Sequence, residues 1–161
     1  MLKKSLRFAV WLQEYFLIVS IVIMTIAAAL QVLYRYVFEL PQSGFEEIAR
    51  YLMVASTFIG VGLAVEKKEH IRLDFLETLL AGHPRANKWI NNINHIIVAI
   101  FSLIMTFLGY QLFVYSLKAN QHSIGANLPL AWFKATVMIG FALSFIHSVG
   151  HLVNSIKKTE K

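Results

Sequence analysis

The sequence predicts an all-α integral membrane protein of four transmembrane helices, with both ends of the chain in the cytoplasm. Hydrophobic residues make up 57% of the chain, and its mean hydropathy of +0.60 exceeds what a globular core of this size can hide. Four long segments carry almost no charge, and the 15 Lys and Arg residues gather at their borders. This placement of positive charge indicates membrane topology rather than nucleic-acid binding.

The four segments are long enough to cross a bilayer. A spanning helix needs about 20 apolar residues, because the hydrocarbon core is about 30 Å thick and a helix rises about 1.5 Å per residue. The expected spans are residues 13–36, 45–66, 90–117 and 132–156, within a single domain of residues 1–161. A basic start before an apolar run is also typical of a cleaved signal peptide, but we expect the first segment to remain as a membrane helix.

Positively charged residues predict the orientation. Eleven of the 15 Lys and Arg residues lie before the first span, between the second and third spans, or after the fourth. Because cytoplasmic loops collect Lys and Arg, we expect both termini and the middle loop in the cytoplasm, and the loops around residues 39–44 and 118–129 outside.

The middle loop carries an amphipathic pattern. Apolar residues recur there at spacings of three and four, beside charged ones, which is typical of a helix that lies in the plane of the membrane surface. We therefore predict a cytoplasmic amphipathic helix between the second and third spans. Its apolar residues are Ile71, Phe75, Leu76, Leu79 and Leu80, and its charged residues are Arg72, Asp74 and Glu77.

Two stripes of small residues repeat every four positions. Small side chains let helix backbones approach closely in lipid, where van der Waals packing replaces the hydrophobic effect. The pattern is compatible with packing inside this chain and with packing against another membrane protein. The stripes are Ser56, Gly60 and Ala64 in the second span, and Gly140, Ser144 and Ser148 in the fourth.

Charged residues enter the start of the second span. That span reaches a sufficient length only if it begins near Phe45, which draws Glu46, Glu47 and Arg50 into its first turns. Charges at a membrane edge persist when they are paired. We expect these three residues and Arg35 to form one ion cluster that fixes the first two helices and faces partner subunits. A proton or cation site is the alternative.

Catalytic and cofactor signatures are missing from the sequence. It has no cysteine, no phosphate-binding glycine loop and no nucleophile elbow, so we expect no enzyme activity and no cofactor. His147 and His151 have metal-ligand spacing and share a depth with His95, without an evident carboxylate, so a four-helix haem protein stays as an alternative. A small self-sufficient exporter would need a membrane carboxylate, and the candidate, Glu14, precedes the first apolar run.

Several short groups of residues follow one another in a specific order. They are Arg35-Tyr36-Val37-Phe38, Pro41, Glu46-Glu47 with Arg50, Gly60 and Ala64, and His70-Ile71-Arg72-Leu73-Asp74. This ordered set resembles the small membrane subunit of tripartite ATP-independent periplasmic (TRAP) transporters, and the four-helix layout extends the resemblance over the whole chain. Phe45, where the family often has tryptophan, and Ala55, where an aromatic residue is frequent, depart from its pattern.

The resemblance implies a non-catalytic subunit of a sodium-coupled transporter in the bacterial inner membrane. In that family a periplasmic binding protein delivers an organic acid to a large permease subunit that carries the sodium and substrate sites. The small subunit would scaffold the large one, help to dock the binding protein and contact membrane phospholipids. A sialic acid is the favoured substrate, with C4-dicarboxylates as the alternative. The candidate interface residues are Arg35, Glu46, Glu47, Arg50, Ser56, Gly60, Ala64, His70, Asp74, Gly140 and Ser144.

Overall fold

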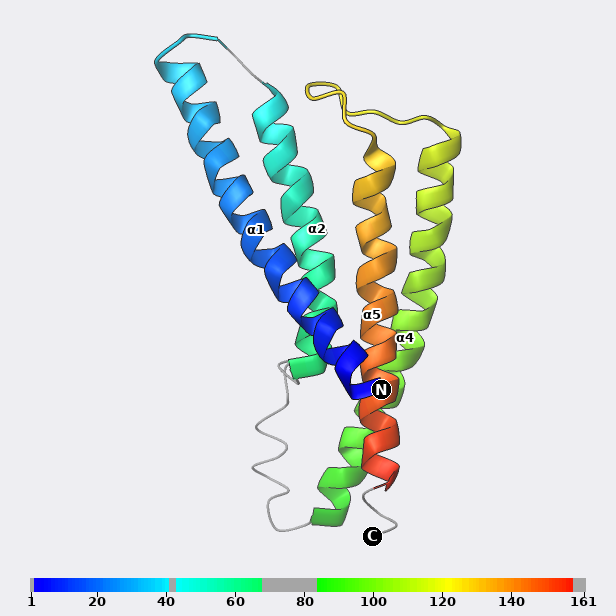
Figure 1. The fold of residues 1–161 in the computed structure, drawn as a ribbon. Helices are drawn as coiled ribbons and strands as arrows, with labels where there is room; N and C mark the ends of the chain where they lie inside the picture. Colours follow the sequence, from blue (N-terminus) through cyan, green and yellow to red (C-terminus); the bar gives the residue numbers. More distant parts are fainter. Residues whose placement is uncertain (1, 41–42, 68–83, 158–161) are drawn as a thin grey trace.

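The computed structural model describes residues 2–40, 43–67 and 84–157, and the regular structure in these ranges is helical (Figure 1). The helices are α1 (Leu2–Tyr36), α2 (Ser43–Lys67), α4 (Pro84–Lys118) and α5 (Leu130–Lys157). The amphipathic helix predicted for residues 70–80 lies outside the described residues, as do His70 and Asp74.

Each of these helices contains a segment that can cross a membrane. The segments are Arg7–Tyr36, Gly44–Lys67, Asn92–Lys118 and Leu130–Val153, so the prediction of four apolar spanning helices is confirmed. Helices α1 and α4 begin at Leu2 and Pro84, before the spanning segments that they contain. At 35 residues each, they are about 52 Å long, and their extra turns extend beyond the roughly 30 Å hydrocarbon core.

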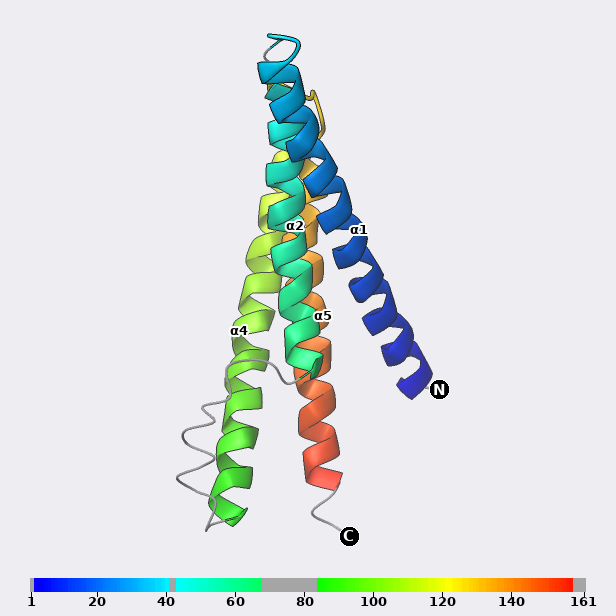
Figure 2. The same cartoon turned by 90° about the vertical axis from the view of Figure 1, so that its left-hand side faces the viewer.

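The helices stand side by side in a row, in the order α1, α2, α5, α4 (Figure 1). The main packing contacts are those of α1 with α2, of α2 with α5, and of α5 with α4. The start of α1 diverges from the other helices, as the view along the row shows (Figure 2). Helices α2 and α5 therefore form the centre of the row, and among the described residues no further helix packs over its broad faces.

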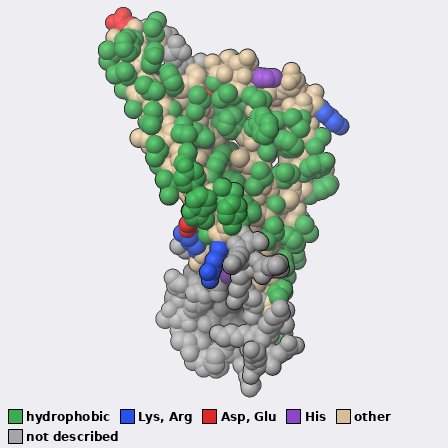
Figure 3. Space-filling view, in the orientation of Figure 1, with side chains coloured by type: hydrophobic (Ala, Val, Ile, Leu, Met, Phe, Trp, Pro, Cys, Tyr) green, Lys and Arg blue, Asp and Glu red, His purple; other side chains and the backbone are tan. Residues whose placement is uncertain are grey.

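Hydrophobic side chains, drawn in green, form a broad band over the described helices on the face shown in Figure 3. Charged side chains lie at the margins of this band. Many of the large apolar side chains are exposed, whereas the buried set includes Ser20, Ser102, Ser144 and Ser148. A soluble protein shows the opposite distribution, so lipid is the solvent that this surface fits. The three tryptophans, Trp11, Trp89 and Trp132, are 56%, 71% and 73% exposed, as is typical of residues at membrane interfaces.

Glycine permits the closest contact between α2 and α5. A Cβ atom on Gly140 would overlap the carbonyl group of Phe58, and one on Gly62 would lie 3.1 Å from the carbonyl oxygen of Gly140. Ser144 and Ser148 continue the buried face of α5. The small stripe of α5 thus packs within this chain.

The small stripe of α2 has a looser environment than its pattern suggested. A Cβ on Gly60 would be 3.9 Å from Leu17 of α1, an ordinary van der Waals distance. Ser56 and Ala64, on the same stripe, are half-buried, and Gly62 makes the tight approach to α5 instead. Sequence spacing identified a small-residue face but missed the glycine where the backbones meet.

Candidate functional sites at the two ends of the bundle

Two short connections lie at one end of the row, which we call the loop end, and α1 starts and α5 finishes toward the opposite, terminal end (Figure 1). The α4–α5 connection closes on itself: Ser123 donates a backbone hydrogen bond to Leu128 (2.9 Å) and Leu130 donates one to Gln121 (2.9 Å). Asn120 and Asn127 adopt positive φ angles of 45° and 50°, which asparagine tolerates better than most residues. The α4–α5 connection is therefore a loop that folds back on itself and is held by its own backbone hydrogen bonds.

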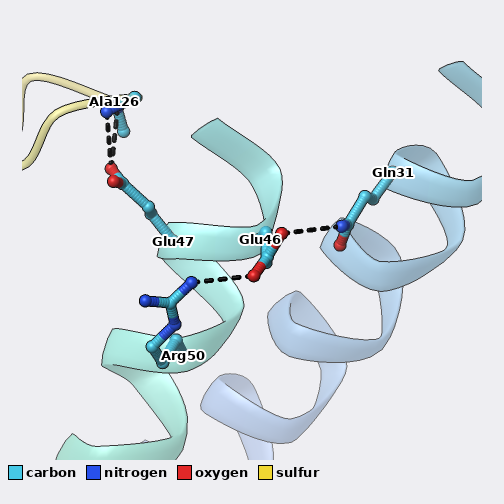
Figure 4. A network of polar contacts seen from close by, with 6 residues as sticks. Gln31, Glu46, Glu47, Arg50 and Ala126 are labelled. Carbon is cyan, nitrogen blue, oxygen red and sulfur yellow. Dashed lines mark hydrogen bonds and ion pairs between the residues drawn. The ribbon is translucent and has the colours of Figure 1, made fainter. Parts of the chain in front are cut away.

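Glu47 fastens this connection to the start of α2. Its Oε2 atom accepts backbone hydrogen bonds from Gly125 (2.9 Å) and Ala126 (3.0 Å) (Figure 4). A carboxylate that accepts two amide hydrogen bonds forms charge-assisted contacts, which are stronger than neutral ones. Glu47 therefore joins segments 78 residues apart along the chain.

Glu46 makes a separate set of contacts. Its Oε1 lies 2.8 Å from Arg50 Nη2, and its Oε2 accepts a 3.3 Å hydrogen bond from Gln31 of α1 (Figure 4). The Arg50 and Glu46 side chains are 55% and 56% exposed. An exposed pair of this kind contributes about 0–1 kcal/mol.

The expected cluster of Arg35, Glu46, Glu47 and Arg50 forms only in part: Glu46 pairs with Arg50 as expected, whereas no ion pair joins Arg35 to either glutamate in the described structure. Gln31, one helical turn before Arg35, is the residue of α1 that reaches Glu46. The Arg35 guanidinium instead lies 5.7 Å from the ring centre of its neighbour Tyr36. The two glutamates diverge because successive helical residues point in different directions, so one faces α1 and the other faces the α4–α5 connection.

The adjacent glutamates offer a matched comparison. Glu47→Ala removes the acceptor of two amide hydrogen bonds, so a spin label on a cysteine at position 124 should become clearly more mobile. Glu46→Ala breaks an exposed contact and should leave the label's spectrum unchanged. The chain has no cysteine, which makes single-site labelling direct. Equal mobility in both variants would show that Glu47 does not order the connection.

A second polar cluster lies toward the terminal end. His147 of α5 has a fully buried side chain, and its Nδ1 lies 2.9 Å from Glu66 Oε2 of α2. Its Nε2 lies 3.4 Å from Gln13 Oε1 of α1. His151 Nε2 is 3.2 Å from the backbone oxygen of Glu66 and 3.4 Å from its Oε2. We call Gln13, Glu66, His147 and His151 the junction cluster, because it joins three helices.

Neighbouring groups surround the junction cluster. The His95 ring of α4 stacks on His151 with centroids 5.3 Å apart and planes 14° apart. Ser148 donates a 2.7 Å hydrogen bond to the His95 carbonyl. Glu14 and Lys67 form an ion pair of 2.9 Å with side chains that are 40% and 42% exposed. The polar residues at this depth thus contact one another across all four described helices.

This geometry bears on both alternatives from the sequence. Bis-histidine haem ligation needs two imidazoles on opposite sides of an iron, whereas His95 and His151 stack directly and His147 faces Glu66. Within the described ranges, no group of three His, Cys, Asp or Glu residues has the arrangement of a metal site. Glu14, the exporter candidate, is ion-paired at the edge of the apolar region.

Sequence reasoning missed Glu66 and Gln13. It found no carboxylate beside the histidines, yet Glu66 contacts both His147 and His151. The available signal was that Glu66 ends the uncharged part of the second span while the histidines sit near the end of the fourth. Spans that run in the same direction through the bilayer bring such residues to one depth.

Comparison with known proteins agrees with the fold. The family described as tripartite ATP-independent periplasmic transporters, DctQ component, matches residues 24–158, which include the end of α1 and the whole of α2, α4 and α5. The chain belongs to this family. A curated relative, the sialic acid TRAP transporter permease protein SiaT of Haemophilus influenzae (strain 86-028NP), is 31% identical over 83 residues.

The match to SiaT involves 52% of this chain and 13% of the relative. This DctQ-family chain thus corresponds to a small part of that permease protein. The family assignment makes it a component of a TRAP transporter, and the four apolar helices agree with a multi-pass membrane protein. The resemblance drawn from the ordered motifs is confirmed at the level of the family.

Proposed function

We propose that this chain is the small, non-catalytic membrane subunit of a sodium-coupled TRAP transporter that takes up an organic acid. Its role is to scaffold the large permease subunit. The observation that carries the proposal is the DctQ-family match over residues 24–158, which includes most of the membrane region. The row-like fold supports it, because a row of helices with two open apolar faces offers a large surface to another membrane protein.

The proposed orientation places the termini in the cytoplasm of a bacterial inner-membrane protein. The loop end is then periplasmic, in line with the distribution of Lys and Arg. The spin label at position 124, used above to compare the glutamates, also reports orientation. A membrane-impermeant reductant added on the periplasmic side should reduce the label and abolish its signal. Loss of the signal only when the reductant is added on the cytoplasmic side would show that the topology is the reverse of the proposed one.

The periplasmic end suits a role in docking the binding protein. The α4–α5 connection is held by Glu47 and lies outside the apolar spans, and Ile124 within it is fully exposed. An exposed apolar side chain on a fixed backbone binds at a lower ordering cost than one on a mobile loop. We therefore include docking of a periplasmic substrate-binding protein in the proposed function.

The relative's description supports the proposed substrate class. SiaT is described as a sialic acid transporter, and this supports a sialic acid as the substrate class, with C4-dicarboxylates second. In the proposed arrangement, selectivity and sodium coupling belong to the other two subunits. Of the Lys, Arg, Asp and Glu residues that the structure describes, none lies at the middle of an apolar span, where coupling sites are usually found.

Co-purification tests the scaffold role. The tagged chain, co-expressed with the large permease subunit of the same transporter, should retain that subunit through detergent extraction and size-exclusion chromatography. The control is a tagged four-helix membrane protein of unrelated family, which should not retain it. Recovery of the large subunit at the control level would contradict the proposal.

A further inference from the structure

The junction cluster makes contacts on both ring nitrogens of a buried histidine. His147 is enclosed between α1, α2 and α5, with its Nε2 directed at Gln13 and its Nδ1 at Glu66. A neutral imidazole carries one N–H and one bare nitrogen, whereas an imidazolium carries two N–H groups. The partners of the two nitrogens therefore define how many protons the site holds.

Gln13 indicates whether the Nε2 atom of His147 carries a hydrogen. The amide nitrogen of Gln13 donates to the backbone carbonyl of Ile59 at 3.4 Å, which turns the amide oxygen toward His147. An amide oxygen only accepts hydrogen bonds. In this amide orientation, the 3.4 Å contact between Gln13 Oε1 and His147 Nε2 favours a hydrogen on Nε2.

Glu66 indicates whether a proton lies between its carboxylate and the Nδ1 atom of His147. With one hydrogen on Nε2, a neutral ring would present the lone pair of Nδ1 to a carboxylate oxygen only 2.9 Å away. Two lone pairs at that distance repel each other. Nδ1 is buried and has no well-aligned hydrogen-bond partner in the described structure. One further proton, on Nδ1 or on the Glu66 carboxyl, turns this repulsion into attraction.

We propose that Glu66 and His147 form a proton-binding site in which one dissociable proton is shared between carboxylate and imidazole. With the proton bound, the pair is neutral overall, as imidazolium with carboxylate or as imidazole with carboxylic acid. Without it, the pair carries one negative charge on Glu66, whose side chain is 31% exposed, beside the fully buried ring of His147. A neutral pair is the favoured form where charge is costly to desolvate.

Further titratable side chains of the described residues lie beside the pair or beside its neighbours. His151 of α5 lies 3.4 Å from the same Glu66 oxygen and also contacts the Glu66 backbone. His95 of α4 is stacked on His151. Lys67 of α2 is directed to Glu14 of α1, where it forms an ion pair. Deprotonation should therefore loosen the contact of α5 with α1 and α2.

The proposal has a definite pH dependence. Between about pH 7 and 9, an unfolded chain has neutral histidine and ionised glutamate, so the folded state holds one more proton. Folded-state stability must then fall as pH rises, by up to about tenfold in the folding equilibrium constant per pH unit. The proton thus acts as a ligand of the folded three-helix junction.

Nitrogen-15 NMR of the full-length, histidine-labelled chain in detergent micelles tests the proton directly. We expect His147 to carry a hydrogen on Nε2 at neutral pH, with Nδ1 either protonated or hydrogen-bonded to a protonated carboxyl. The exposed His122, whose Nδ1 lies 2.8 Å from the Asn120 carbonyl oxygen, supplies a second signal for comparison. A His147 with its single hydrogen on Nδ1 and a bare Nε2 would overturn the proposal.

Variants test the pH dependence independently. Glu66→Gln supplies an amide N–H to the bare Nδ1 without an added proton, so it should fold and lose the fall in stability between pH 7 and 9. Glu14→Gln, which changes the neighbouring exposed carboxylate, should keep the wild-type pH dependence. A wild-type chain without this fall, or a Glu66→Gln variant that retains it, would contradict the shared proton.

Discussion

Replacing Gly140 by alanine should destabilise the folded chain by roughly 2 kcal/mol. The added Cβ would overlap the carbonyl group of Phe58, which is backbone and cannot rotate away. Overpacking of this kind typically costs 1–3 kcal/mol, and here α2 and α5, the central pair of the row, must separate. The gain of about 1 kcal/mol in helix propensity from Gly to Ala offsets only part of this cost.

The same helix provides a matched control. A Cβ on Gly150 would meet nothing within 4 Å, so Gly150→Ala should leave stability unchanged or raise it by up to about 1 kcal/mol. Reversible unfolding in mixed detergent micelles, followed by circular dichroism, measures both variants. If Gly140→Ala were as stable as Gly150→Ala, the close crossing of α2 and α5 would be incorrect.

The four spans were predictable because bilayer thickness imposes a length on every charge-free interval. The helical turns that extend beyond these spans were not predictable in the same way. The residues of α1 before Arg7 and those of α4 before Asn92 precede the apolar spans, and a helix needs no apolar pattern there. Interrupted hydrophobicity therefore marks the boundary of the hydrocarbon core, whereas the helix itself continues through Lys3 and Lys4.

Contacts between helices were less predictable than the helices. Glu46 and Glu47 stood out correctly as unusual charges, but their partners depend on how far α2 is rotated about its axis. That rotation directs Glu47 to the backbone of Gly125 and Ala126, far away in sequence. Backbone amides leave no signature in a sequence, so an ion pair with Arg35 was the natural, and wrong, expectation.

The junction cluster shows the same limitation at the other end of the bundle. His147 and His151 were recognisable by their spacing, whereas Glu66 was visible only as the boundary of a span. Their apposition follows from the close crossing of α2 and α5 that Gly62 and Gly140 permit. Small residues in a span therefore indicate which helices pack together. The polar contacts between those helices can be predicted only when the positions at which the helices cross are known.

Omitting this chain from a reconstituted transporter should abolish uptake. In the proposed arrangement the large permease subunit carries the sodium and substrate sites, the binding protein delivers the substrate, and this chain supplies the scaffold and part of the docking surface. Without this chain, the large permease subunit lacks the scaffold that the proposal gives it. Loss of that scaffold should leave substrate binding by the isolated periplasmic protein unchanged while transport stops.

The most direct measurement is sodium-driven uptake of radiolabelled sialic acid into proteoliposomes, with all three components or with one omitted. A C4-dicarboxylate serves as the second substrate. We predict uptake above empty vesicles only when this chain, the large permease subunit and the binding protein are all present. Undiminished uptake without this chain, or uptake by this chain alone, would contradict its role as the small subunit of a tripartite transporter.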